Sequence, residues 1–184
     1  MDKTFDMKRK DYLRLSGWVL QFMRGLCILA LAFMLYDGIR HSIDPEYYFV
    51  RWEWYGLSGD MDFVEEGEYP PQTAASYYFN WIQISIQLVL MFLVWTQLIK
   101  VLNSVVSFET FISDNPIRFR KIGSLILGIF FMDLFHFFDG MASADTEIQV
   151  GANFSILFFA LGAYVLAIVF EEGKRLAEEQ KLIV

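Results

Sequence analysis

Residues 151–170 read GANFSILFFALGAYVLAIVF, a run with no charged residue and no proline. About twenty consecutive apolar residues are what a helix needs to cross the hydrocarbon core of a bilayer. Working outward from this run, we find three further apolar stretches of similar length, at about residues 17–38, 78–101 and 122–140. The sequence therefore predicts an all-α membrane protein: a single domain over residues 1–184, built as an antiparallel four-helix transmembrane bundle.

Composition agrees with a membrane protein and argues against several other classes. Hydrophobic residues make up 55% of the chain, charged residues only 20%, and the charges cluster between the apolar stretches. The net charge of −7 argues against direct nucleic-acid binding. A single cysteine, Cys27, excludes an intramolecular disulfide and a cysteine zinc site. The two histidines, His41 and His136, are expected at different depths, which argues against a bis-histidine haem. We predict no cofactor, no metal and no enzymatic activity.

The distribution of lysine and arginine predicts the orientation. Basic residues are dense in the N-terminal segment, between the second and third stretches, and in the C-terminal tail. The segment joining the first two stretches holds only Arg40 and Arg51. Because cytoplasmic loops carry the excess of basic residues, we predict that both termini are cytoplasmic.

The outer segment, residues 41–76, is long for a connection in a small protein. Aromatic, β-branched and charged residues alternate over 46–55, and GLSGD at 56–60 is typical of a turn. We therefore predict a small extracytoplasmic cap that contains a β-hairpin over residues 46–66.

On the cytoplasmic side two helices extend beyond the membrane. Ser113-Asp114-Asn115-Pro116 is typical of a helix start, with a polar cap followed by proline in the first turn. This predicts an extension of the third helix over residues 116–121. The fourth helix is expected to continue over 171–181, because oppositely charged residues recur there four apart, as in Glu171 and Arg175.

These two cytoplasmic segments carry a family resemblance. FISDNPIRFRKIG at 111–123 and VFEEGKRLAEEQKLIV at 169–184 resemble a bacterial four-helix inner-membrane family catalogued only as a domain of unknown function. Its members read F-x-x-x-N-x-x-R-x-[RK]-K-I-G before the third span and end in F-x-x-G-x-x-L-x-x-E-[QN]-x-[LE]-x-[IV]. This chain differs in having Pro116 directly after the asparagine. The resemblance implies a location in the bacterial inner membrane. Members are often encoded beside a small Cro-like helix-turn-helix regulator, which implies a regulatory role.

Two charged residues lie inside the predicted spans, Arg24 and Asp133. Charges in a bilayer are costly unless they are paired, so we predict an Arg24–Asp133 ion pair between the first and third helices. Two alternatives remain open: Arg24 extends to the inner headgroups, or the pair takes part in transport or proton relay.

Helix two carries a polar face made by Asn80, Gln83 and Gln87. With Asp133 and His136 these residues are candidates for an outward-facing polar cavity. The alternative is hydrogen bonding between helices, worth about 0.6 kcal/mol for each bond in a membrane.

The function we predict is a non-enzymatic membrane regulator that holds a cytoplasmic protein partner. By the resemblance, that partner is a helix-turn-helix regulator. The ordered apolar end of the tail is expected to take part, because exposed apolar residues gain nothing in water. The predicted partner-binding residues are Arg118, Arg120, Lys121, Arg175, Leu182, Ile183 and Val184. Alternatives are a small-molecule binder or transporter that uses the intramembrane polar residues, and an accessory subunit of a membrane complex; homo-oligomerisation is left open.

Overall fold

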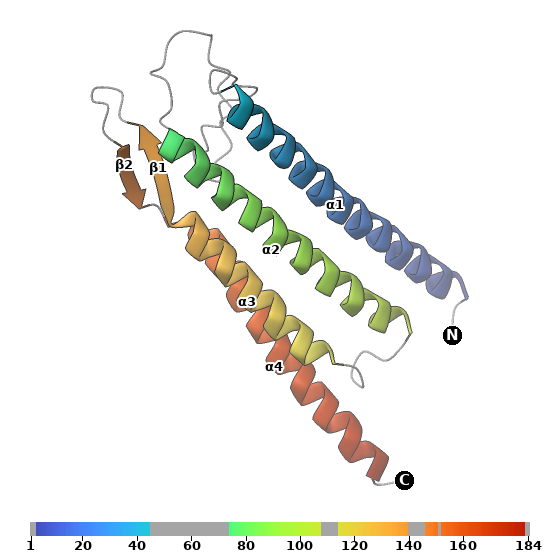
Figure 1. Cartoon of the computed structure of the whole chain (residues 1–184). Helices are drawn as coiled ribbons and strands as arrows, with labels where there is room; N and C mark the ends of the chain where they lie inside the picture. Colours follow the sequence, from blue (N-terminus) through green and yellow to red (C-terminus); the bar gives the residue numbers. More distant parts are fainter. Residues whose placement is uncertain (1–2, 45–73, 108–113, 140–145, 151, 183–184) are drawn as a thin grey trace.

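The structure is a computed structural model that describes residues 3–44, 74–107, 114–139, 146–150 and 152–182. Within these residues the chain forms α1 (Lys3–Ile43), α2 (Ala74–Val106), α3 (Asn115–Asp133), β1 (Phe135–Asp139), β2 (Thr146–Val150) and α4 (Phe154–Leu182). Consecutive helices run in opposite directions, as predicted (Figure 1). Both termini therefore lie at the same end of the molecule, which we call the termini end. The β-hairpin lies at the other end, which we call the hairpin end.

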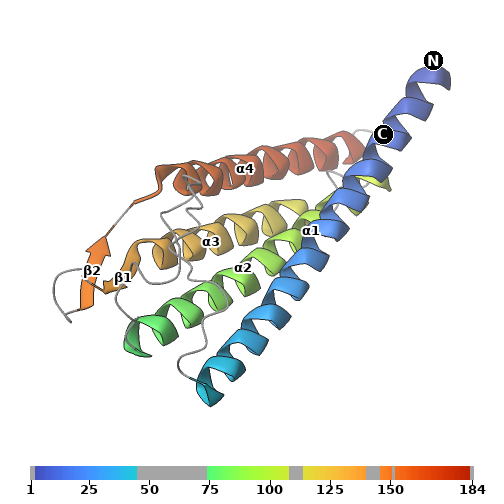
Figure 2. The ribbon, with the colours of Figure 1, turned by 90° about the horizontal axis from the view of Figure 1, so that it is seen from above.

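The helices form an open row rather than a closed bundle. α1 packs on α2, α2 packs on α3, and α3 packs on α4 (Figure 2). One cluster of buried apolar residues is shared by the last three helices: Val94 and Val101 from α2, Phe119 and Ile122 from α3, and Ala163 and Ala167 from α4. α1 contributes nothing to this cluster and lies at the edge of the row.

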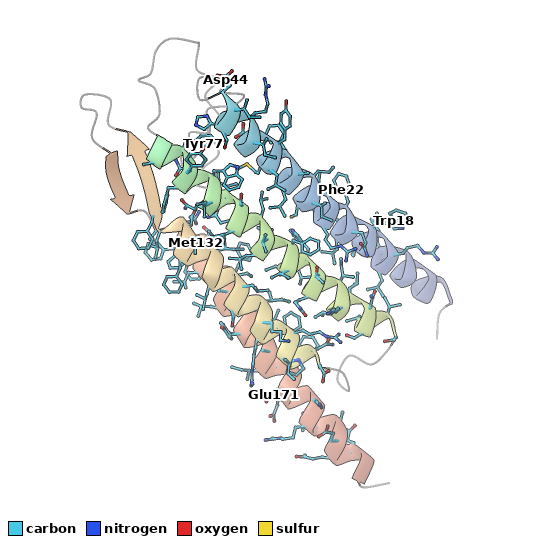
Figure 3. All side chains as sticks on the ribbon, viewed as in Figure 1. Trp18, Phe22, Asp44, Tyr77, Met132 and Glu171 are labelled. Atoms are coloured by element: carbon cyan, nitrogen blue, oxygen red, sulfur yellow. The ribbon has the colours of Figure 1, made fainter. Side chains whose placement is uncertain are left out.

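Three helices are long and apolar enough to cross a membrane. The candidate spans are Tyr12–Ile43 in α1, Tyr77–Val106 in α2 and Phe154–Gln180 in α4. α3 is not one of them, because Arg118, Arg120 and Lys121 occupy its first two turns. Large apolar side chains such as Trp18 and Phe22 project from α1 and are mostly exposed, as expected of a helix that faces lipid (Figure 3).

The helix starts agree with local capping chemistry. α3 begins at Asn115 with Pro116 in its first turn, where the missing N–H costs nothing, so the predicted start is confirmed. The Asp114 side chain, however, makes no capping hydrogen bond. α4 begins at Phe154, slightly later than predicted. The side chain of Asn153 accepts a hydrogen bond from the Ser155 N–H there, as an N-cap residue does.

The third helix ends earlier than the sequence predicts. We expected helix to residue 140, but α3 ends at Asp133, and β1 pairs antiparallel with β2, with Phe137 opposite Ile148. Aromatic and β-branched residues are apolar enough to be counted in a predicted membrane span, yet they favour strands. Hydrophobic periodicity alone does not distinguish a buried helix from a buried strand over so short a run. The hairpin predicted over 46–66, and the cap built on it, lie outside the described residues.

Candidate functional sites at the two ends of the row

Close pairs of residues fix the relative depth of the helices. A Cβ on Gly17 would lie 3.6 Å from Leu102, which aligns the termini ends of α1 and α2. Near the hairpin end, the Gln83 amide donates to the main-chain carbonyl of Met132, which aligns α2 with the end of α3. Several of the hydrogen bonds between helices lie close to one of these two levels.

At the hairpin end, α1 and α2 are joined by a set of polar and aromatic side chains that we call the latch. Tyr77 donates its hydroxyl to Asp37 Oδ2 at 2.7 Å, and the Ser42 and Tyr78 hydroxyls lie 3.1 Å apart. The Trp81 indole N–H donates to the main-chain oxygen of Met34 at 2.7 Å. The latch comprises Met34, Asp37, His41 and Ser42 of α1 and Tyr77, Tyr78 and Trp81 of α2.

The latch residues of α1 are placed by helical spacing. Met34, Asp37, Gly38 and His41 recur three and four apart, so they share the face that packs on α2, and all four are buried. The His41 ring lies over the Tyr77 ring, with centroids 3.7 Å apart. A Cβ on Gly38 would come within 2.8 Å of the Trp81 ring, so glycine is what lets the indole reach the α1 backbone.

The sequence reasoning missed the latch. It ended the first helix at Gly38 and placed His41 in the loop beyond, whereas α1 continues to Ile43. The available signal was the pair Asp37 and His41, four residues apart on one face of a helix that need not stop at a glycine. Their partner Tyr77 stands just before the predicted second span, where tyrosine is easily taken for an interfacial anchor.

The structure places the residues of the predicted polar cavity on three elements, α2, the end of α3 and β1. Gln83 is buried and bonded to Met132, which agrees with the alternative of hydrogen bonding between helices. Asn80 and Gln87 are half-buried on α2. His136 was expected one helical turn beyond Asp133, but it lies in the strand β1. Its side chain is outside the described part of the structure.

The structure does not bring Arg24 and Asp133 together. α2 lies between α1 and α3, so the two helices are not the neighbours that the predicted pair requires. From the Gly17–Leu102 and Gln83–Met132 contacts, the two residues also differ in depth by twelve α2 positions, or about 18 Å. Arg24 is half-buried and makes no ion pair with a described carboxylate, whereas Asp133 is buried at the end of α3.

At the termini end, α2 and α3 are joined by a buried hydrogen-bond network. Asn115 is fully buried, and its amide N–H donates to Ser104 Oγ at 2.7 Å. Arg118 reaches back to the main-chain oxygen of Lys100 at 2.9 Å and to the Asn115 amide oxygen at 3.3 Å. The asparagine and arginine of the block at 111–123 therefore hold two helix ends together, and Arg118, one of the predicted partner-binding residues, takes part in this network.

The two blocks that carry the family resemblance pack against each other. Phe119 of α3 stacks on Phe170 of α4 with ring centroids 5.1 Å apart. Arg120 forms an exposed ion pair with Glu171 at 2.5 Å. A Cβ on Gly123 would lie 2.8 Å from the Tyr164 ring, so glycine admits that ring between the helices.

Beyond Glu171 the surface is polar and open. Arg175 pairs with Glu179, four residues on, as the charge spacing predicts; it also pairs with Glu172, whereas Glu171 pairs with Arg120 of α3. Lys121 is exposed on α3. The predicted partner-binding residue Leu182 ends α4, and Ile183 and Val184 lie outside the described residues. Among the described residues, no three metal-ligating side chains come together.

A family model described as "Protein of unknown function (DUF2975)" matches residues 63–184. No curated protein and no solved structure matches the chain. The matched region contains α2, α3 and α4, whereas α1 lies before it.

Proposed function

The chain belongs to the DUF2975 family, and we propose that it is a non-enzymatic regulator of the bacterial inner membrane. In this proposal the protein holds a cytoplasmic partner at the termini end of the row. The function rests on a surface for protein docking and not on a reaction centre.

The direction of the helices supports four membrane crossings. α2 and α4 both run from the hairpin end to the termini end, and each is long and apolar enough to span a bilayer. If both cross, the chain must return between them, and α3 lies packed on both. Its 19 residues correspond to about 28 Å, close to the thickness of the hydrocarbon core. An even number of crossings leaves both termini on one side, and the basic residues there favour the cytoplasm.

The open row argues for docking over transport. A path through a bundle needs helices that surround it, whereas here each helix packs on its neighbours in a row. Gln83 and Asp37 are engaged in hydrogen bonds between helices instead of lining a shared route.

The observation that carries the proposal is the length of α4. The ion pair at Glu171 is the last hydrogen bond or ion pair described between α4 and α3, and the helix continues to Leu182. These eleven further residues correspond to about 16 Å of helix that projects past the row (Figure 1). Leu176 on this projection is half exposed, which suits an anchor residue for a partner.

The partner class comes from the family resemblance, which implies a small helix-turn-helix regulator. The test uses the regulator encoded beside the gene, purified and added to the full chain in lipid nanodiscs. We expect stoichiometric capture, and loss of capture when Leu176→Glu is introduced.

The matched control is Glu178→Gln, which changes an exposed residue of the same projection and should leave capture intact. Both variants should give the same membrane yield and thermal midpoint as the unmodified chain. If the unmodified chain captures no regulator, or if removal of residues 174–184 leaves capture unchanged, the proposal is wrong.

A further inference from the structure

The contact between α1 and α2 repeats every seven residues, as in an antiparallel coiled coil. A Cβ on Gly17 would meet Leu102, and a Cβ on Gly38 would meet Trp81. The two glycines are 21 residues apart in α1 and their partners are 21 residues apart in α2, so three heptads connect the two contacts. We call this line of contact the seam. It comprises Gly17, Arg24, Leu31 and Gly38 of α1 and, opposite them in this order, Leu102, Trp95, Leu88 and Trp81 of α2.

Arg24 therefore stands in the seam, at a position where the repeat otherwise holds glycine or leucine. Its neighbour Cys27 is buried and hydrogen-bonded to Trp95, which agrees with the register that sets Arg24 opposite this tryptophan. Arg24 itself is half-buried. A charged side chain thus begins between two membrane-spanning helices and not on the lipid-facing side of α1.

The charge of Arg24 is not compensated within the described part of the protein. A guanidinium cannot lose its proton in a protein, so the charge is permanent. Arg24 makes no hydrogen bond or ion pair with a described residue. Its partner position Trp95 lies near the middle of the candidate span Tyr77–Val106, so the backbone of Arg24 is within the hydrocarbon. An unpaired charge at this depth is costly, which implies a counter-charge from outside the described chain.

The geometry of α1 indicates where that counter-charge lies. Side chains on a helix lean toward the N-terminus of their own helix, which for α1 is the termini end of the molecule. In that direction the next seam residue is Gly17, about 10 Å away along the helix, and it has no side chain to block the path. Gln21, one turn from Arg24 on the same side, is exposed. The guanidinium is thereby directed toward the lipid headgroups at the termini end, as arginines inside membranes often are.

We infer that Arg24 binds the phosphate of an anionic phospholipid in the leaflet at the termini end, with the Gln21 amide as a second donor. The guanidinium presents N–H groups in a planar fork that matches two phosphate oxygens. An anionic headgroup neutralises the arginine, whereas a zwitterionic headgroup brings its own cation. Ile28 and Leu35 follow Gln21 at intervals of seven residues and are exposed, so the acyl chains have an apolar edge of α1 to lie along.

The test offers lipids to the purified full chain in detergent and counts bound lipid by native mass spectrometry. Phosphatidylglycerol and phosphatidylcholine with the same acyl chains are added in equal amounts. We expect the unmodified chain to retain one phosphatidylglycerol in preference to phosphatidylcholine. Phosphatidylglycerol should also raise the thermal midpoint, because a ligand that binds only the folded state stabilises it. Inorganic phosphate should leave the midpoint unchanged.

Three variants separate the seam arginine from the general positive charge of this end. Arg24→Gln removes the charge and should weaken the retention of phosphatidylglycerol about tenfold. Arg24→Lys keeps the charge without the planar fork, and its retention should fall between the two. The matched control is Arg14→Gln, because Arg14 is an exposed arginine of the same helix that lies off the seam, and its loss should leave retention unchanged.

Equal retention of the two lipids by the unmodified chain would overturn the inference, and this comparison needs no variant to fold. Unchanged retention in Arg24→Gln would overturn it as well. A midpoint that rises with inorganic phosphate alone would show a site for soluble anions instead. If Arg24→Gln lowers the midpoint without lipid and phosphatidylglycerol still stabilises it fully, the arginine pairs within the protein. No protein partner is present, so these outcomes are independent of the proposed docking function.

Discussion

Asn115 illustrates how one polar side chain joins two helices at the termini end. It is fully buried, and its amide N–H donates to Ser104 Oγ; the single hydroxyl proton of Ser104 has two acceptors within reach, the Asn115 amide oxygen and the main-chain oxygen of Val101. Removing the amide takes away the donor to the buried Ser104 oxygen and one of the two oxygens that Arg118 contacts, and a buried polar group that loses a partner costs more than an exposed one.

We therefore expect Asn115→Ala to lower the free energy of unfolding by about 1–3 kcal/mol. The readout is the thermal midpoint in detergent, followed by size-exclusion chromatography. Asn103→Ala is the matched control, because Asn103 is exposed on the neighbouring helix and only its main-chain oxygen is engaged. Equal midpoints for the two variants would contradict a structural role for the buried amide.

Some helical glycines are packed against a neighbouring side chain, and others face open space. The substitution of glycine by alanine should therefore have opposite effects on stability at the two kinds of position. Gly123→Ala pushes a methyl group against the Tyr164 ring at 2.8 Å, and overpacking of this kind costs about 1–3 kcal/mol. Gly162→Ala meets nothing within 4 Å and should be neutral or slightly stabilising, because alanine is the better helix former. The measurement is the thermal midpoint of each variant compared with that of the unmodified chain. A loss of equal size at both positions would mean that backbone flexibility, and not the ring, requires Gly123.

Among the elements, α3 was the hardest to predict. Its start could be predicted from the sequence because asparagine and proline act locally, within one turn of the helix. Its end was not, since FHFFD at 135–139 is apolar enough for a span and gains its strand conformation from pairing with β2. α1 was underestimated at both ends, and at the hairpin end the reason is similar: the helix continues past Gly38 because tertiary contacts such as the latch hold it.

The early end of α3 predicts where its last turn lies in the bilayer. Met132 shares its depth with Gln83, close to the hairpin-end limit of the α2 span, whereas Met91 is near the middle of that span. In a Cys27→Ser background, Met132→Cys should react with a membrane-impermeant maleimide, and Met91→Cys should not. The two methionines are equally exposed in the protein, at 37% and 38%, so the contrast reports on lipid and not on packing. Labelling of both positions, or of Met91→Cys alone, would contradict this depth.

At the scale of the whole molecule, the sequence predicts the number and direction of the helices better than their arrangement. Hydropathy and capping are local properties, and they gave four antiparallel helices. Which helix packs on which depends on how side chains fit across helices, and residue spacing within one helix does not report on that. The expected contact of α1 with α3, on which the Arg24–Asp133 pair depended, could therefore not be judged from the sequence.

The shared end of the two termini gives a direct test of orientation. We expect a fluorescent protein fused after Val184 to fluoresce in intact bacteria, because that fold matures in the cytoplasm. Alkaline phosphatase, which is active only outside the cytoplasm, should be active when fused after Ile43 and inactive when fused after Val184. Phosphatase activity at the C-terminus would reverse the predicted orientation.

The latch also has a consequence for the order in which the protein is made. Tyr77 follows Asp37 by 40 residues, so the carboxylate enters the membrane well before its hydrogen-bond donor has been synthesised. At about 5–20 residues per second the delay is about 2–8 s. During that interval the ribosome and the insertion machinery must shelter a buried acidic group that has no described partner upstream of it. Nascent α1 is therefore expected to stay beside the translocon until α2 emerges, and the first two helices to enter the lipid as a pair.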